Sequence, residues 1–194
     1  MADAAGQGWR RRLLRQCGVP AIRRLGASAD GSAAVEFAIV AMPFLAVLLA
    51  ILETGLFMWA SQVLDTATTL ASRKILTGQA QNGNFTRDRF KSELCSQIVG
   101  LIDCSKVILD VQSSSGWGSI GMDPPVTAGE VVATGQTYDP GTAGDVVMVR
   151  AVYQYPLLMR TFGLSFADLD NGNRLLVSTV VFKNEPYIST GTTP

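Results

Sequence analysis

Residues 37–52 form an uninterrupted apolar run, and this run constrains the fold more than any other feature of the chain. Glu53 follows it, and the sequence then stays mostly apolar. As one helix, residues 37–60 would be about 36 Å long, whereas a bilayer core requires about 20 residues. The segment is therefore predicted to cross a membrane, with Glu53 and Trp59 near its far edge. Pro43 is expected to bend this helix, either as a tolerated membrane proline or as a point of flexing when the helix leaves lipid.

The charge distribution predicts the orientation of this segment. The chain has 194 residues and no net charge, but residues 1–31 carry six arginines against two aspartates, a net charge of +4. The positive-inside rule places this basic head in the cytoplasm and the body across the membrane, in the periplasm of a bacterium. A conventional signal peptide fits less well, because its apolar core is only about 7–15 residues long. The mildly acidic body argues against a nucleic-acid partner.

Gly31 and Glu36 stand where the basic head meets the apolar run. A simple anchor has no need for a carboxylate there, since charge is costly at membrane depth. The arrangement suggests a cut after Gly31, which would give Ser32 a free ammonium one helical turn from Glu36. Three interpretations of Glu36 remain open: an interfacial charge without a role, a carboxylate favoured by the helix dipole, or a group for recognition and pairing. Glu53 is expected either to reach the far interface or to pair with a partner helix.

The composition argues against an enzyme. The chain contains no histidine, which removes the commonest general base and the commonest metal ligand. It also lacks a nucleophile elbow, a P-loop and a cluster of metal ligands. The acidic stretch 168–173 fails the spacing of a calcium loop, because Asn173 stands where an EF-hand has glycine, and is predicted to be a turn. We expect no catalytic residue, no metal, no cofactor and no small-molecule substrate.

The body beyond the membrane is predicted to have an α+β fold. Residues 61–77 continue the helical pattern and Gly78 is a plausible stop. The apolar stripe of this segment comprises Leu64, Ala67, Leu70, Ala71 and Ile75. Residues 79–84 are polar and turn-like, and Thr86 suits the N-cap of a second helix that ends near Gly100.

Three segments have the composition of strands: residues 106–112, 146–155 and 174–183. The last is apolar on both faces, which suits a central or covered strand. With the long helix packed on it, an antiparallel sheet of three or four strands completes the domain.

Two cysteines of the body, Cys95 and Cys104, are candidates for a disulfide. In one continuous helix they would be about 13 Å apart, too far for a bond. A break near residues 100–103 would bring them together, and an oxidising compartment would favour the bond. The alternative is two buried free thiols, whereas zinc requires more ligands than this pair supplies. Cys17 lies in the basic head and cannot join them.

A long loop separates the first two strands. Residues 113–145 include seven glycines and three prolines. Loops of this length are usually functional or disordered. Residues 131–133 suit a short additional strand. Trp117 lies among glycines and is either a loop anchor or a contact surface for another subunit.

The chain resembles a known family over about half of its length. Gly31 with Glu36, the stretch AAVEFAIVAMPFL and the following ILETGLFMWASQVLDTATTLASR are similar to the TadE-like pseudopilins of the tight-adherence (Flp, type IVb) pilus machinery. Two further matches are the cysteine-bearing ELCSQIVGLIDCSKVILDVQ and FKNEPY near the end.

This resemblance implies a pilin-like fold in three parts: a basic prepilin-type leader at residues 1–31, a transmembrane helix at 32–60 and a periplasmic domain at 61–194. It implies that an inner-membrane aspartyl prepilin peptidase cuts between Gly31 and Ser32. The product would be a minor pilin, pseudopilin or assembly factor whose partners are other pilins and the assembly platform. Type IV major pilins usually have phenylalanine directly after the cut, so Ser32 leaves N-terminal methylation open. The rival interpretation is an uncleaved, membrane-anchored periplasmic adaptor of a secretion or envelope complex.

Overall fold

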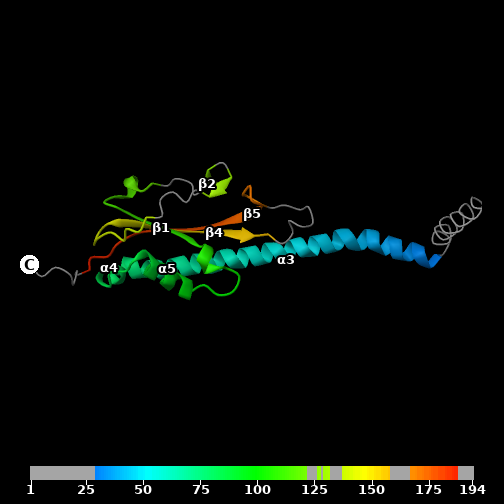
Figure 1. Cartoon of the computed structure of the whole chain (residues 1–194), viewed down its shortest axis with the longest axis horizontal. Helices are drawn as coiled ribbons and strands as arrows, with labels where there is room; N and C mark the ends of the chain where they lie inside the picture. The colour runs from blue at the N-terminus through cyan, green and yellow to red at the C-terminus, as the bar shows by residue number, and fades with distance from the viewer. Residues whose placement is uncertain (1–28, 122–125, 128, 132–136, 158–166, 188–194) are drawn as a thin grey trace, which may run out of the picture. The chain divides into compact units, whose positions relative to one another are not determined.

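The structure is a computed structural model that describes residues 29–121, 126–127, 129–131, 137–157 and 167–187 (Figure 1). The predictions for most of the basic head, including Cys17, lie outside these residues. The chain divides into two compact units, Met1–Ala50 and Ile51–Pro194. The first contains the start of the long helix, and the second contains all of the sheet.

A single helix, α3, runs from Ala29 to Leu76 and contains Pro43. The predicted continuation of the apolar segment into the body is therefore confirmed. Within the second unit, small and aliphatic residues of α3 alternate at three- and four-residue spacing on its buried face, which is how an amphipathic helix covers a sheet. These residues are Ala60, Leu64, Ala67, Ala71 and Ile75. Leu70, which we assigned to the same stripe, is instead exposed because it lies at the edge of the buried face.

Three antiparallel strands form the main sheet in the order β1-β4-β5. They are β1 Ile108–Ser114, β4 Val146–Pro156 and β5 Asn173–Lys183. Val149 of β4 pairs with Val111 on one side and with Val180 on the other. The α+β, pilin-like fold class is confirmed.

The prediction that residues 174–183 form a central or covered strand is wrong, because β5 is at the edge of the sheet. Its inner face contributes Leu176 and Ser178 to the buried region, whereas Val177 on its outer face is exposed. β4 holds the central position instead, and nearly every one of its residues is buried on one face or the other. A run that is apolar on both faces thus identified a strand but not its place in the sheet.

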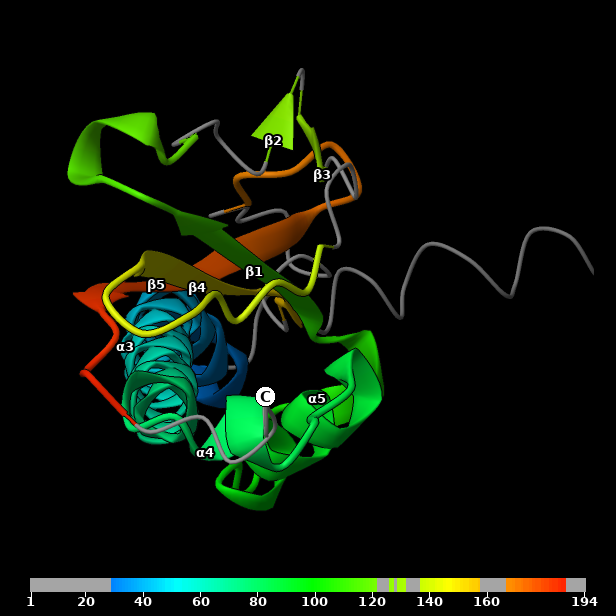
Figure 2. The ribbon, with the colours of Figure 1, turned by 90° about the vertical axis from the view of Figure 1, so that its left-hand side faces the viewer.

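The helices of the second unit lie on one side of the sheet, and the short hairpin lies on the other (Figure 2). The helical side comprises the C-terminal half of α3 with α4 Gln79–Asn82 and α5 Arg87–Ser96. The hairpin consists of β2 Val126–Thr127 and β3 Glu130–Val131. The hydrophobic core fills the space between helices and sheet; its members include Leu64, Ile75, Phe90, Leu94, Leu109, Val111, Val147, Val149 and Tyr153.

Local sequence signals predicted the start of α5 correctly and its end less accurately. Thr86 accepts a hydrogen bond from the Arg89 backbone N–H at 3.3 Å, which confirms the predicted N-cap. The helix ends at Ser96 rather than near Gly100. A 3₁₀ turn, η1 Cys104–Lys106, delays the start of the first strand by two residues relative to the prediction. Residues 79–82, predicted as a turn, form the one-turn helix α4.

The described parts of the loop at 113–145 include a 3₁₀ turn, η2 Trp117–Ser119, and the β2–β3 hairpin. The predicted short strand at 131–133 is confirmed only at its first residue, since 132–133 lie outside the described residues. Near its end the loop returns to β1. Val111 donates a backbone hydrogen bond to Thr137 and accepts one from Asp139, at 2.9 and 3.0 Å. The intervening Tyr138 packs its ring on Phe90, with centroids 5.7 Å apart.

The C-terminal segment 184–187 closes the end of the domain at which α3 stops. Asn184 is buried, and its side-chain amide donates to the carbonyls of Pro140 and Thr142 at 2.9 and 3.0 Å. Glu185 donates its backbone N–H to the carbonyl of Leu76, the last residue of α3, at 3.0 Å. Such bonds satisfy the last carbonyls of a helix and fix its end.

Gly78 ends α3 in the left-handed conformation, with φ of 75°, and faces the ring of Tyr187. A Cβ atom at this position would overlap that ring. We expect Gly78→Ala to lower the free energy of unfolding by about 1–3 kcal/mol, because the left-handed backbone alone costs about 1–2 kcal/mol for an L-residue. Urea unfolding of the full chain in detergent measures this. Gly118→Ala, at an open position, is the control and should change stability by less than about 0.5 kcal/mol. Equal effects of the two substitutions would contradict this account of Gly78.

Burial raises the pKa of Tyr138 to about 12, and its buried hydroxyl has no hydrogen-bond partner among the described residues. Between pH 10 and 12 the unfolded chain releases this proton while the folded chain keeps it, so stability falls as pH rises. We expect the stability of wild type relative to Tyr138→Phe to fall by about 1–2 kcal/mol across this range, somewhat below the full linkage value because the residue is only partly buried. Urea unfolding at pH 9 and pH 11.5 tests it. Parallel pH profiles for the two proteins would refute the assigned burial.

Candidate functional site

The apolar part of α3 in the first unit is exposed on every side. Phe37 and Met42 have exposed fractions of 75% and 77%, and the large apolar side chains between residues 35 and 52 are exposed throughout. Among the described residues, α3 is the one helix that is long and apolar enough to cross a membrane, judged by length and composition. A helix that is hydrophobic all round belongs in a membrane or a large core. These residues therefore have the surface expected of a lipid-facing or bundle-forming segment.

Gly31, Ser32 and Glu36 lie on the first turns of α3. The helix begins at Ala29, so the bond between Gly31 and Ser32 lies within its first turn. The Ser32 hydroxyl donates a hydrogen bond to Oε1 of Glu36 at 3.1 Å. The predicted one-turn spacing of these two residues is thus present, and their side chains are in contact. Both side chains are exposed, and their roles in cleavage and assembly stay predictions.

Glu53 lies within the second unit and is covered by its own chain. Only 5% of its surface is exposed. Burial raises the pKa of Tyr155, and the charge of Glu53 raises it further, which places the carboxylate near the end of β4. The sequence did not predict that the Glu53 side chain would be buried by its own chain. The predicted role of Glu53 in pairing with another helix stays a prediction, and it would require a partner to reach a residue that is already covered.

Aromatic and cationic groups surround this position. Phe57, one turn after Glu53, packs edge-to-face on Tyr155 with ring centroids 6.0 Å apart. The guanidinium of Arg174, at the start of β5, lies 4.0 Å from the centre of the Phe57 ring, and its Nε is 3.5 Å from Asp168. Sequence reasoning missed this cluster, because its members come from three separate elements and no local pattern joins them. It ties α3 to the ends of β4 and β5.

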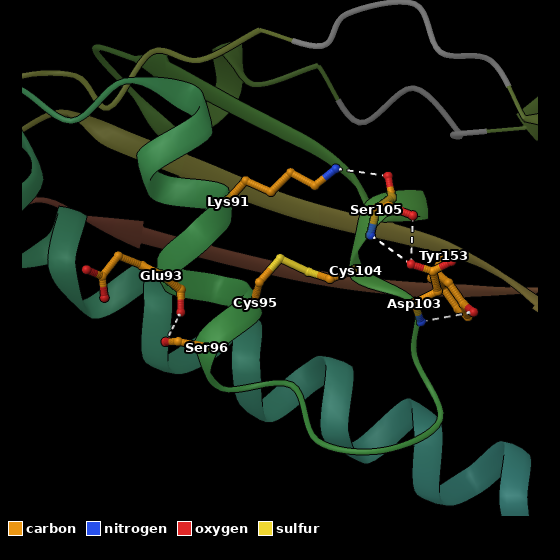
Figure 3. The surroundings of a disulfide bond; sticks show 8 residues. All are labelled: Lys91, Glu93, Cys95, Ser96, Asp103, Cys104, Ser105 and Tyr153. Atoms are coloured by element: carbon orange, nitrogen blue, oxygen red, sulfur yellow. Dashed lines mark hydrogen bonds between the residues drawn. A yellow bond between two sulfur atoms is a disulfide. The ribbon is translucent and has the colours of Figure 1, made fainter.

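Cys95 and Cys104 form a disulfide, with their Cα atoms 5.9 Å apart (Figure 3). The prediction is confirmed, and the alternative of two free thiols is wrong. The bond joins the last turn of α5 to η1. Beside it the Asp103 carboxylate accepts from the backbone and the hydroxyl of Ser105, at 3.1 and 2.7 Å. These two hydrogen bonds lower the pKa of Asp103, and Lys91 adds a bond to the Ser105 carbonyl at 3.3 Å.

Trp117 lies in η2 and is 63% exposed. The interpretation of this residue as a loop anchor that packs down on the domain is therefore wrong. An exposed tryptophan is expensive to leave in water and is enriched in binding hot spots. Its role as a contact for another subunit stays a prediction.

The described residues contain no group of three or more His, Cys, Asp or Glu residues that could hold a metal ion. The stretch at 168–173 makes a turn in which Gly172 has a positive φ, as predicted for that segment. Asp168 pairs with Arg174 there.

Comparison with known proteins gives one finding. Residues 31–73 match the family model described as TadE-like protein. The resemblance inferred from the sequence is confirmed over this segment, which holds Gly31, Glu36 and Glu53. TadE-like proteins are a family of pilus proteins and not of enzymes. No curated protein and no solved structure matches the chain.

We expect the disulfide to stabilise the second unit. Replacing both Cys95 and Cys104 with serine should lower the free energy of unfolding by about 2.5–3 kcal/mol, the loop-entropy value for a ring of this size. Urea unfolding in detergent measures the difference, and Cys17→Ser provides the control, since that residue is outside the bonded pair. A wild-type chain that unfolds at the same urea concentration with and without a reducing agent would contradict the expected contribution.

Proposed function

We infer from the TadE-like match at residues 31–73 that this chain is a component of a tight-adherence (Flp) pilus assembly system. Beyond that, we propose that it is a minor pilin or pseudopilin that is inserted in the inner membrane, cut after Gly31 and then drawn into a pilus base or tip. One observation supports this proposal most directly. Gly31 and Glu36 lie five residues apart at the start of a helix whose apolar surface is exposed on all sides.

The proposed topology follows from charge and length. The arginines of residues 1–31 hold the precursor's N-terminus in the cytoplasm, and the second unit lies in the periplasm. The proposed transmembrane segment is the part of α3 within residues 32–60. A periplasmic location agrees with the disulfide between Cys95 and Cys104, because such bonds persist in oxidising compartments.

The cut changes what the helix can do. It removes the net charge of +4 carried by residues 1–31 and so lowers the cost of moving the helix out of the bilayer. It also creates an ammonium at Ser32. Glu36 can then pair with that ammonium or with that of a neighbouring copy. In a low-dielectric environment such a pair balances its desolvation only with good geometry, so it sets register more than it adds stability.

The proposed partners follow from this sequence of events. A prepilin peptidase of the inner membrane recognises the segment around Gly31 and Ser32. Other pilins or pseudopilins then pack against the exposed surface of α3, and the assembly platform moves the cut chain. Trp117 provides an exposed contact on the periplasmic unit.

Intact-mass analysis of the protein extracted from membranes of its native host tests the cut. We expect a chain that begins at Ser32, and we expect Gly31→Ala to retain all of residues 1–31, because the substitution adds a side chain at the residue before the cut. A full-length wild-type chain in a host that has the peptidase and forms normal pili would overturn the proposal and favour the uncleaved periplasmic adaptor.

A second pair of variants separates cutting from pairing. Glu36→Ala should leave most of the chain cut but reduce its recovery with sheared pili at least about tenfold, since the buried ammonium of a neighbour would lose its partner. Ser32→Ala is the matched control, because it removes the 3.1 Å hydroxyl bond to Glu36 and keeps the new ammonium. Blocked cutting with unaffected assembly of the cut fraction would contradict the pairing role of Glu36.

A further inference from the structure

The segment that the disulfide closes exposes apolar side chains. Residues 97–103 connect α5 to η1, and all of them before Asp103 are uncharged. Val99 is 70% exposed and Leu101 is 39% exposed, although both are large aliphatic residues. Gly100 between them has φ of 93°, a conformation that suits glycine and turns the chain at this point. We call residues 97–102 the apolar loop.

The apolar loop lies beside α3 at Trp59. A Cβ atom on Gly100 would be 3.6 Å from the Trp59 ring, so the two are nearly in contact. Trp59 is 52% exposed and its neighbour Met58 is exposed as well. Two separate elements of the second unit that meet at Gly100 and Trp59 therefore each carry exposed apolar side chains, and exposed apolar surface of this kind marks an interaction site.

The position of this patch along α3 identifies what it meets. A bilayer core about 30 Å thick takes up about 20 helical residues, so a span that ends at Leu52, before the covered Glu53, begins near Ala33. Trp59 lies about 10 Å further along the helix. Because helical side chains point back toward the N-terminus, its ring extends toward the headgroup layer, where tryptophan is favoured. The exposed apolar surface of α3 at Ile51 and Leu52 continues directly into this patch.

We propose that the apolar loop inserts Val99 and Leu101 into the periplasmic headgroup layer of the phospholipid bilayer, beside Trp59. The inference rests on the proposed membrane span of α3. The disulfide serves this contact: it fixes both ends of the loop to the domain, so that the loop cannot fold away from lipid. The loop would hold the periplasmic unit against the membrane surface before assembly and would leave the lipid when the helix is extracted.

Fluorescence quenching by brominated lipid tests the contact. The full chain is reconstituted in phosphatidylcholine vesicles whose acyl chains are brominated near the glycerol end. Trp9, Trp59 and Trp117 are replaced with phenylalanine, and Val99→Trp supplies the only indole. Leu101→Trp in the same background is a second probe, so that one misfolded variant does not decide the result. Two further proteins retain only Trp59 or only Trp117.

We expect about twofold quenching at positions 99 and 101 and at Trp59, and almost none at Trp117. Replacing Cys95 and Cys104 with serine should reduce the quenching at position 99. Quenching of Trp59 without quenching at 99 and 101 would overturn the lipid contact while leaving the membrane span intact, and would favour another subunit as the occupant. If the protein fails to float with the vesicles, the span itself is refuted and the inference with it.

Discussion

The structure depends on one helix that must satisfy two environments. From residue 37 to residue 52 the side chains of α3 are apolar in every direction, and from Glu53 onward only one face is buried. That face is built from alanines and larger aliphatic residues, and the alanines let the sheet approach closely. Thr68 and Ser72 are also buried there, and each donates its hydroxyl to a carbonyl one turn earlier in the helix at 2.7 Å. The buried polar groups are thus satisfied within α3, and the sheet needs to supply few partners.

The change of environment is concentrated around Glu53. A carboxylate among the apolar side chains before this point would be costly in a membrane, whereas an exposed carboxylate on the domain costs little. Glu53 instead lies under the ends of β4 and β5, near Tyr155 and one turn from Phe57. The cation–aromatic contact of Arg174 with Phe57 adds a positive charge to the same region. The polar and aromatic groups of three elements therefore meet where the helix stops being apolar all round.

Local signals in the sequence predicted the elements and failed on their arrangement. The period of α3, the Thr86 cap and the alternation of the strands are properties of neighbouring residues, so they could be read directly. The edge position of β5 depends on the pairing of strands far apart in the chain, and no local pattern contains it. The same reason explains why the burial of Glu53 and the contact of Tyr187 with Gly78 were missed. The disulfide was predictable because its ring is short and the break in the chain before Cys104 could be anticipated.

Two contacts hold the domain to α3, one toward each end of the helical segment that the domain covers. At the far end the carbonyl of Leu76 accepts the backbone N–H of Glu185. At the near end the disulfide-closed loop reaches Trp59. The helical segment between these two contacts packs against the domain along its length. A force applied along the helix axis is therefore distributed over many contacts. Pro43 lies before the first buried residue of α3, so a bend there would leave these contacts in place. If the helix is extracted from a membrane as proposed, it can therefore bend in its apolar part while its contacts with the domain stay in place.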